Sequence, residues 1–127
     1  MAKKRDMADS AVIDAVAETI AERHEQFLAL AEKGKSKSAR KATSRTVRLF
    51  AAGPHKIAQK LGEEAVEAVI EGSRGRSGAL VEESVDLLFH LMVLWQATGV
   101  QPGEVWAEMA KRHGLPENLE RVGRTKD

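Results

Sequence analysis

Two pairs of acidic residues, each spaced by three positions, are the residues of this chain best suited to chemistry. Glu64 and Glu67 form the first pair, and Glu83 and Asp86 form the second. Residues three apart share one face of a helix, so each pair presents two carboxylates together. Carboxylate oxygens are preferred ligands of hard cations such as Mg²⁺ and Mn²⁺. The spacing therefore favours a divalent-cation site, and the alternative is that these acids lie on two solvated helix faces.

A short turn between the two pairs determines how they would meet. Residues 72–78 read Gly-Ser-Arg-Gly-Arg-Ser-Gly, a composition typical of turns. A short turn makes the flanking helices antiparallel neighbours. A hairpin folded about residue 75 places Glu64 level with Asp86, and Glu67 level with Glu83. Four carboxylates would then converge, and a bound cation would offset their mutual repulsion.

Apolar residues surround these acids on both helices, which favours an inward position. The first helix has Leu61, Ala65, Ala68 and Val69 on one side, with Val66 and Ile70 nearly opposite. A helix that is apolar on opposing sides is expected to be sandwiched between neighbours. More neighbours are needed than one hairpin supplies, so the pattern favours a homodimer. The second helix surrounds Glu83 and Asp86 with apolar residues from Leu80 to Leu94.

Helical periodicity and helix-end signals predict that the whole chain is all-α. We expect a first helix from a cap at Asp9 or Ser10 to about Lys33, with one apolar face on the core, and a short helical turn over residues 46–52. Three more helices are expected at about 54–71, 77–98 and 103–113. Gly99 and Gly114 are expected to end the last two of these helices.

Length and composition narrow the class of protein. The 127 residues fit one domain, with residues 1–8 and 116–127 expected to be mobile tails. The formal net charge is +1, and the absence of cysteine excludes disulfides and thiolate metal sites. The first residues lack the apolar core of a secretory signal, and the stretch Val85 to Val100 is too short and too polar to span a membrane. We therefore expect a soluble, cytoplasmic protein.

A basic segment precedes the first acidic helix. Residues 33–48 are rich in lysine and arginine, and no acid occurs from Lys33 to Gly62. Residues 34–41 fit a flexible surface linker, whereas the whole zone fits an electropositive wall for a polyphosphate ligand. A nucleic-acid arm is the third interpretation. Nucleic acid is the least favoured partner because no aromatic residues alternate with the basic ones.

Three residues near the acidic pairs have two interpretations each. Lys60 shares a helical stripe with Glu64 and Glu67, which fits either an ion pair or a phosphate contact. His90 lies one turn beyond Asp86. It fits either a hydrogen-bonded core residue or a ligand. Trp95 lies on an apolar face, which favours core or dimer packing over stacking on a base.

The chain from Ser44 to Gly114 resembles the phosphoribosyl-ATP pyrophosphohydrolase family of histidine biosynthesis, within the MazG-like all-α nucleotide pyrophosphohydrolases. The superfamily signature, EExxE followed by ExxD, occurs as Glu63-Glu64-Ala65-Val66-Glu67 and Glu83-Ser84-Val85-Asp86. More specific features are the KxGEEAxE form at 60–67, the DLLxHLxVL form at 86–94 and the ending Ala110-Lys111-Arg112-His113. The chain departs from the family at Phe89, where tyrosine is usual, and at Ser84 and Val85, where small alanines are usual.

The resemblance implies hydrolysis of phosphoribosyl-ATP to phosphoribosyl-AMP and pyrophosphate, the second step of histidine biosynthesis. It implies a MazG-like helical bundle that a homodimer completes, with Mg²⁺ or Mn²⁺ held by Glu64, Glu67, Glu83 and Asp86. Glu63, Glu64 and Glu67 are the expected catalytic residues, with Glu63 orienting the water or a ligand. The expected substrate contacts are Arg48, Lys56, Lys60, His90 and Arg112.

Two other functions stay open at this point. One is a house-cleaning pyrophosphohydrolase of the MazG-like class that acts on another nucleoside triphosphate. The other is a non-enzymatic helical module that binds a partner or nucleic acid through the basic segment. Converging carboxylates disfavour the latter because they would repel nucleic acid.

Overall fold

The computed structural model describes residues 9–113, and every regular element in that range is a helix. The predicted all-α class is therefore confirmed. The expected tails at 1–8 and 116–127 lie outside the described residues, as does the expected helix end at Gly114. In the described range, no helix is both long enough and apolar enough to cross a bilayer.

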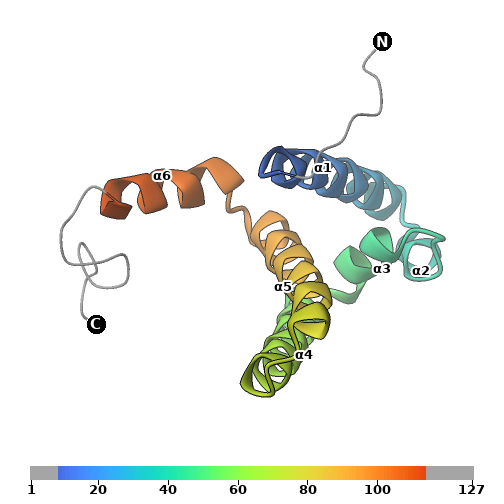
Figure 1. Ribbon diagram of the computed structural model, residues 1–127. Coiled ribbons are helices and arrows are strands. Elements are labelled where there is room, and N and C mark those ends of the chain that lie inside the picture. The colour runs from blue at the N-terminus through green and yellow to red at the C-terminus, as the bar shows by residue number, and fades with distance from the viewer. Residues whose placement is uncertain (1–8, 114–127) are drawn as a thin grey trace, which may run out of the picture.

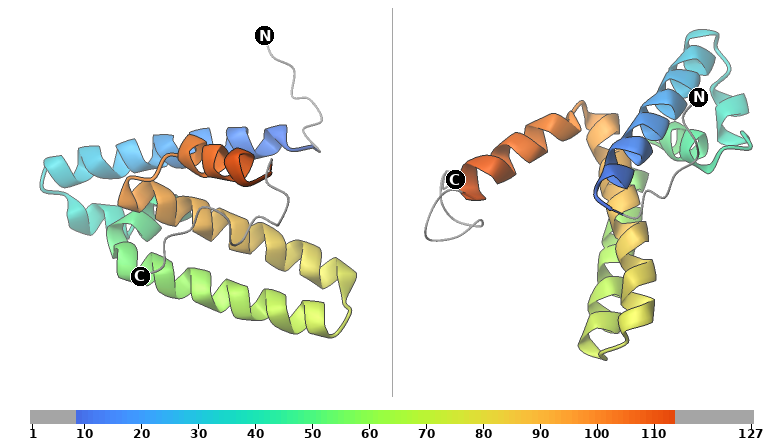
Figure 2. Two further views of the ribbon diagram at one scale, coloured as in Figure 1. Left: turned by 90° about the vertical axis from the view of Figure 1, so that its left-hand side faces the viewer. Right: turned by 45° about the horizontal axis from the view of Figure 1, so that its top comes forward.

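The centre of the fold is an antiparallel hairpin of α4 (Pro54–Ser73) and α5 (Ser77–Thr98) (Figure 2). Pro54 occupies the first turn of α4, where its missing N–H is not needed. The turn between the helices contains Gly75, whose φ of 69° lies in the left-handed region that glycine adopts most readily. Gly99 ends α5 in the left-handed conformation, as predicted. The hairpin therefore folds about the residue that its sequence indicated.

The core forms where α1 (Ala11–Glu32) and α3 (Arg45–Ala52) meet one end of the hairpin (Figure 1). Its buried side chains come from four helices: Ile20, Leu49, Phe50, Ile57, Met92 and Val93. Helix α1 turns a single apolar face to this core, as expected. Trp95 packs against the same core, which confirms the first of its two interpretations. The far half of the hairpin extends beyond the core.

One expectation about the basic segment is wrong. Residues 34–41 do not form a flexible linker, because α2 (Ser36–Arg40) lies within them. Ala39 of this helix has no exposed surface, and α2 contacts both α1 and α3. The N–H of Lys35 also donates to the carbonyl oxygen of Leu30 over 2.8 Å. The burial of Ala39 and the backbone hydrogen bond between Lys35 and Leu30 thus hold a strongly polar segment in place.

Helix α3 is longer by one residue than the helical turn expected at 46–52. Ser44 caps it, since its hydroxyl oxygen accepts a 3.2 Å hydrogen bond from the N–H of Val47. At the start of α1 the carboxylate of Asp9 accepts a hydrogen bond from the N–H of Ala11, whereas the Ser10 side chain makes no cap. These ends fix the two helices that border the hairpin.

The last helix, α6 (Pro102–His113), projects away from the hairpin (Figure 1). None of its residues is buried. Its contact with α5 includes the two tryptophans, Trp95 and Trp106, whose ring centroids lie 5.7 Å apart at 80°. Helix α6 therefore lies outside the core that the other helices build.

Candidate functional site

The hairpin brings acidic side chains of α4 and α5 together. Glu64, Glu83 and Asp86 each place one carboxylate oxygen within 4.8 Å of the others. All three side chains are partly buried. The predicted convergence of acids from the two helices is therefore present, because three-residue spacing on each antiparallel helix aligns them.

Glu67 lies one turn beyond Glu64 at the edge of this group and is exposed. A hydrogen bond with Glu64 and the charge of Glu64 raise the pKa of Glu67, and the charge of Asp86 adds to the rise. The register about residue 75 predicted that four carboxylates meet, whereas the structure groups three of them and leaves Glu67 at the edge, within electrostatic reach of the others. We refer to Glu64, Glu67, Glu83 and Asp86 as the acid cluster.

Glu83 is the most constrained member of the acid cluster. Its Oε2 atom is buried and has no hydrogen-bond partner among the described residues. Desolvation by burial raises the pKa of Glu83, and the charges of Glu67, Glu64 and Asp86 raise it further. A buried carboxylate oxygen without a partner is costly unless a cation or a proton satisfies it.

The donor set fits a hard divalent cation. Two oxygen ligands of one Mg²⁺ lie roughly 3 to 4 Å apart, given metal–oxygen distances of about 2.1 Å. The three carboxylate oxygens lie within 4.8 Å of one another, which is close to this spacing. Glu83, whose Oε2 lacks a partner among the described residues, belongs to this donor set.

Glu63 stands beside the acid cluster rather than in it. It is exposed, and its Oε2 accepts a 3.0 Å hydrogen bond from the amide of Gln59. This contact orients the carboxylate along α4. Glu63 and Glu67 both line a hollow along α4.

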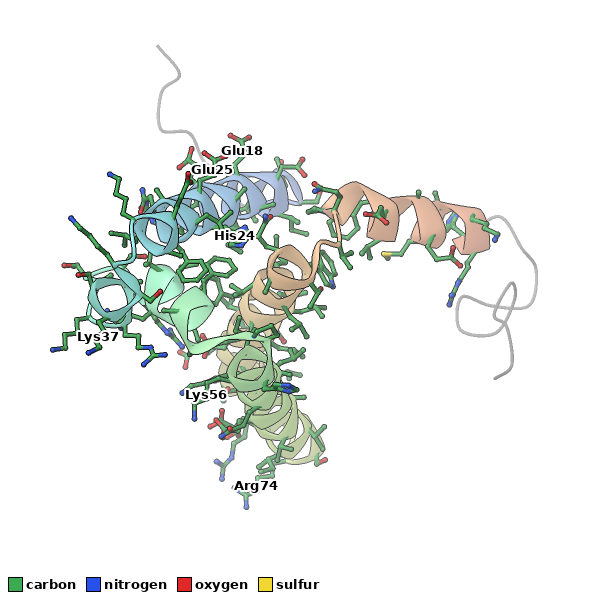
Figure 3. The ribbon with its side chains drawn as sticks, turned by 180° about the vertical axis from the view of Figure 1, so that it is seen from behind. Glu18, His24, Glu25, Lys37, Lys56 and Arg74 are labelled. Atoms are coloured by element: carbon green, nitrogen blue, oxygen red, sulfur yellow. The ribbon has the colours of Figure 1, made fainter. Side chains whose placement is uncertain are left out.

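A basic groove runs between α3 and α4, and α4 is also the helix that carries Glu64 and Glu67. It has a volume of about 270 Å³ and is lined by Arg45, Arg48, Leu49, Ala52, Lys56 and Lys60. Arg48 is held in place by hydrogen bonds to the carbonyl oxygens of Ala42 and Thr43. Lys56 points outward on the same side of the molecule as Lys37 (Figure 3). Three of the expected substrate contacts, Arg48, Lys56 and Lys60, thus line one groove.

The ion-pair interpretation of Lys60 is not realised. Among residues 9–113 the ion pairs are Arg76–Glu71 and Arg112–Glu108, and neither includes a lysine of α4. Lys56 and Lys60 therefore keep their charges available on the groove surface.

The structure does not bring His90 or Arg112 to the site in the expected way. His90 has no exposed surface, so it occupies the core position that was its alternative interpretation. Its burial follows from its place on the core face of α5, one turn before the buried Val93. Arg112 lies near the end of α6 and donates to Glu108 over 2.8 Å, on a helix that points away from the hairpin.

Arg45 is the residue that sequence reasoning missed. It lines the basic groove and also a largely apolar hollow of about 350 Å³ between α1 and α5, which Asp86 borders. The signal was its spacing of three from Arg48 at the start of a capped helix, which puts both arginines on one face.

Comparison with known proteins gives the family. The sequence matches the family described as phosphoribosyl-ATP pyrophosphohydrolase over residues 29–113. It is 51% identical to a phosphoribosyl-ATP pyrophosphatase of Granulibacter bethesdensis over 67% of this chain and 53% of that protein. It is 51% identical to one of Azospirillum brasilense over 69% of this chain and 79% of that protein.

A third relative aligns over more of the chain. The phosphoribosyl-ATP pyrophosphatase of Rhodospirillum rubrum is 42% identical over 91% of this chain and 87% of that protein. The matched part thus spans about half of one relative's length and most of another's. The family match includes both helices of the hairpin and the whole basic groove. The chain belongs to the phosphoribosyl-ATP pyrophosphohydrolase family.

Proposed function

We propose that this protein hydrolyses phosphoribosyl-ATP to phosphoribosyl-AMP and pyrophosphate, in the histidine pathway and in the cytoplasm. The observation that carries the proposal is the meeting of Glu64, Glu83 and Asp86, with a buried oxygen of Glu83 left without a partner. The names of the relatives supply the substrate.

The acid cluster would hold Mg²⁺, with Mn²⁺ as a substitute of the same ligand preference. Four carboxylates supply the oxygens. A hydrogen bond with Glu64 raises the pKa of Glu67 and burial raises the pKa of Glu83, and the neighbouring negative charges, which a cation would offset, raise both further. A bound divalent cation neutralises phosphate oxygens and lowers the pKa of a coordinated water.

The chain's own residues would position the polyphosphate. Arg48, Lys56 and Lys60 place three cations along the groove beside α4, where they can pair with phosphate oxygens. In the reaction a water oxygen bonds to the α-phosphorus, and the bridging oxygen leaves with pyrophosphate. Glu63 lies beside the acid cluster on α4 without belonging to it, where it can accept the proton that water loses.

A homodimer would complete the bundle. Val66 and Val69 of α4 are 58% and 65% exposed, and Val81 and Val85 of α5 are 64% and 62% exposed. The sandwiched arrangement expected for α4 is therefore not met within one chain. Exposed apolar residues on both helices of the hairpin favour an interface, and a second copy has the matching residues.

The test is release of pyrophosphate from phosphoribosyl-ATP with Mg²⁺ and with chelator, beside ATP and the deoxynucleoside triphosphates. We expect turnover of phosphoribosyl-ATP that chelator abolishes. Turnover of the other triphosphates in its place would move the protein to the house-cleaning class. Turnover that survives both chelator and Asp86→Ala would overturn the role of the acid cluster.

A further inference from the structure

Arg45 lies beside the acid cluster and pairs with no carboxylate of the described residues. The ion pairs within residues 9–113 do not include it. Its guanidinium contacts two uncharged rings instead: one nitrogen lies 3.3 Å from Nε2 of His90, and its central carbon lies 5.8 Å from the ring centroid of Phe89. An arginine that is held by neutral groups keeps its full charge for an anionic ligand.

The contacts of His90 determine the direction of its hydrogen bonds. Arginine can only donate, so Nε2 of His90 accepts the hydrogen bond from Arg45. The proton of the neutral ring is then on Nδ1, which donates to the backbone carbonyl oxygen of Asp86 over 2.8 Å. Because the ring is fully buried, these two bonds fix its orientation. His90 therefore links the Arg45 guanidinium to the backbone of an acid-cluster residue.

The position of Arg45 indicates what it would bind. It borders both the groove with Arg48, Lys56 and Lys60 and the hollow with Asp86. A phosphate group that bridges the cations of the groove and the acid cluster would pass this guanidinium. Arginine presents two parallel N–H donors to phosphate, and a guanidinium that is already oriented loses less entropy on binding.

We propose that Arg45 binds a phosphate oxygen of the nucleotide and that His90 is the positioning residue that orients Arg45 for this contact. The inference rests on the proposed function and deepens it. It assigns a substrate contact outside the set expected from the sequence. It also replaces the expected direct role of His90 with one that acts through Arg45.

The first test compares Arg45→Gln with Arg74→Gln, which removes the same charge at the tip of the hairpin (Figure 3). We expect Arg45→Gln to raise KM for phosphoribosyl-ATP about 10- to 100-fold and to weaken pyrophosphate binding with Mg²⁺ similarly. Arg45→Lys should give a KM between those of the wild type and Arg45→Gln, because lysine keeps the charge but loses the paired N–H donors of the guanidinium. Calorimetric Mg²⁺ binding without nucleotide should not weaken in any of these variants.

The second test examines the link through His90. The amide of His90→Gln can reach the place of Nε2 and accept from Arg45, whereas His90→Asn reaches only the place of Nδ1. We expect His90→Asn to raise KM with little change in kcat, and His90→Gln to restore KM. In the Arg45→Gln background, His90→Asn should not raise KM further. An equal rise in KM in both backgrounds would show that His90 acts only on the fold.

The outcomes separate the inference from the proposed function. If the wild-type protein does not hydrolyse phosphoribosyl-ATP but its pyrophosphate binding requires Arg45, the proposed function fails and the phosphate contact stands. If the wild-type protein is active and Arg45→Gln matches Arg74→Gln in both KM and pyrophosphate affinity, the inference is overturned. If neither turnover nor pyrophosphate binding occurs, both fail.

Discussion

Glu64 of α4 and Glu83 of α5 place carboxylate oxygens within 4.8 Å of each other across the hairpin. Two anions at this distance repel; burial raises the pKa of Glu83, and the charges of Glu67 and Glu64 raise it further. The arrangement therefore costs stability in the absence of a cation, which is expected where function rather than folding selects the residues.

Glu83→Gln should stabilise the metal-free protein and abolish its activity. The neutral amide removes the repulsion and can donate a hydrogen bond to a neighbouring acid, so Tm in chelator should rise by several degrees. Turnover should fall on the order of 100-fold or more because a charged group of the site is lost. Glu82→Gln, an exposed neighbour on α5, is the matched control and should change neither quantity. A lower Tm for Glu83→Gln in chelator would contradict this account.

Mg²⁺ should stabilise the wild-type protein against thermal unfolding. Linkage predicts about 2.7 kcal/mol when the free ion is at 100 times its Kd. Asp86→Asn should lose most of this gain because one acid-cluster charge is gone. The measurement is a melting series against Mg²⁺ concentration. Equal metal-dependent shifts in the wild type and the variant would place the ion elsewhere.

His24 should make the protein less stable in weak acid. The amide of Gln96 donates to Nδ1 of His24 over 3.0 Å, which requires an unprotonated Nδ1, and the ring lies against Phe50 on the inner side of α1 (Figure 3). Desolvation lowers the pKa of His24 below 6.5, although Glu25 acts in the opposite direction. Between that lowered pKa and 6.5 the unfolded state binds more protons, so stability falls as the pH falls through this window.

His24→Gln should therefore reduce the loss of Tm between about pH 7.5 and pH 5.5, because this window contains the unfolded pKa. The exposed His55 of α4 provides the control, and His55→Gln should leave the pH dependence as in the wild type. Parallel curves for all three proteins would show that His24 does not contribute.

The exposed apolar surface of the hairpin should be the dimer interface. Val69→Asp places a charge where 65% of the valine is exposed in one chain, and it should shift the protein to monomer in sedimentation experiments. Leu28→Asp, at a 48% exposed apolar residue of α1, is the control and should leave the assembly unchanged. A wild-type protein that sediments as a monomer at micromolar concentration would exclude the interface.

The acid-free zone should steer the anionic substrate. Lys37 and Lys56 lie on the same side of the molecule, and no acid occurs between residues 33 and 62 (Figure 3). Lys37→Glu should lower kcat/KM severalfold at low ionic strength, and the difference should vanish at about 0.5 M salt, where charges are screened beyond a few Å. A loss that persists at high salt would instead indicate direct contact.

The hairpin and its acids could be predicted because the residues that determine them are close together in the sequence. Glu64 and Glu83 are brought together by helix periodicity and one turn at Gly75, all of which lie within a short stretch. The burial of Ala39 was not predictable in the same way, since it depends on α1 and α3 packing on either side of α2. Arg45 was missed for a related reason. Its neighbours His90 and Phe89 are 45 and 44 positions away, and no periodicity links them.

The hairpin also affects how the acid cluster assembles when the chain folds. The acid cluster comes from one uninterrupted stretch, Glu64 to Asp86, so closing it requires only a short loop and little chain entropy. Contacts of such low sequence separation form quickly. Closing the acid cluster therefore costs less chain entropy than the packing of α1 against α5, which joins distant parts of the sequence.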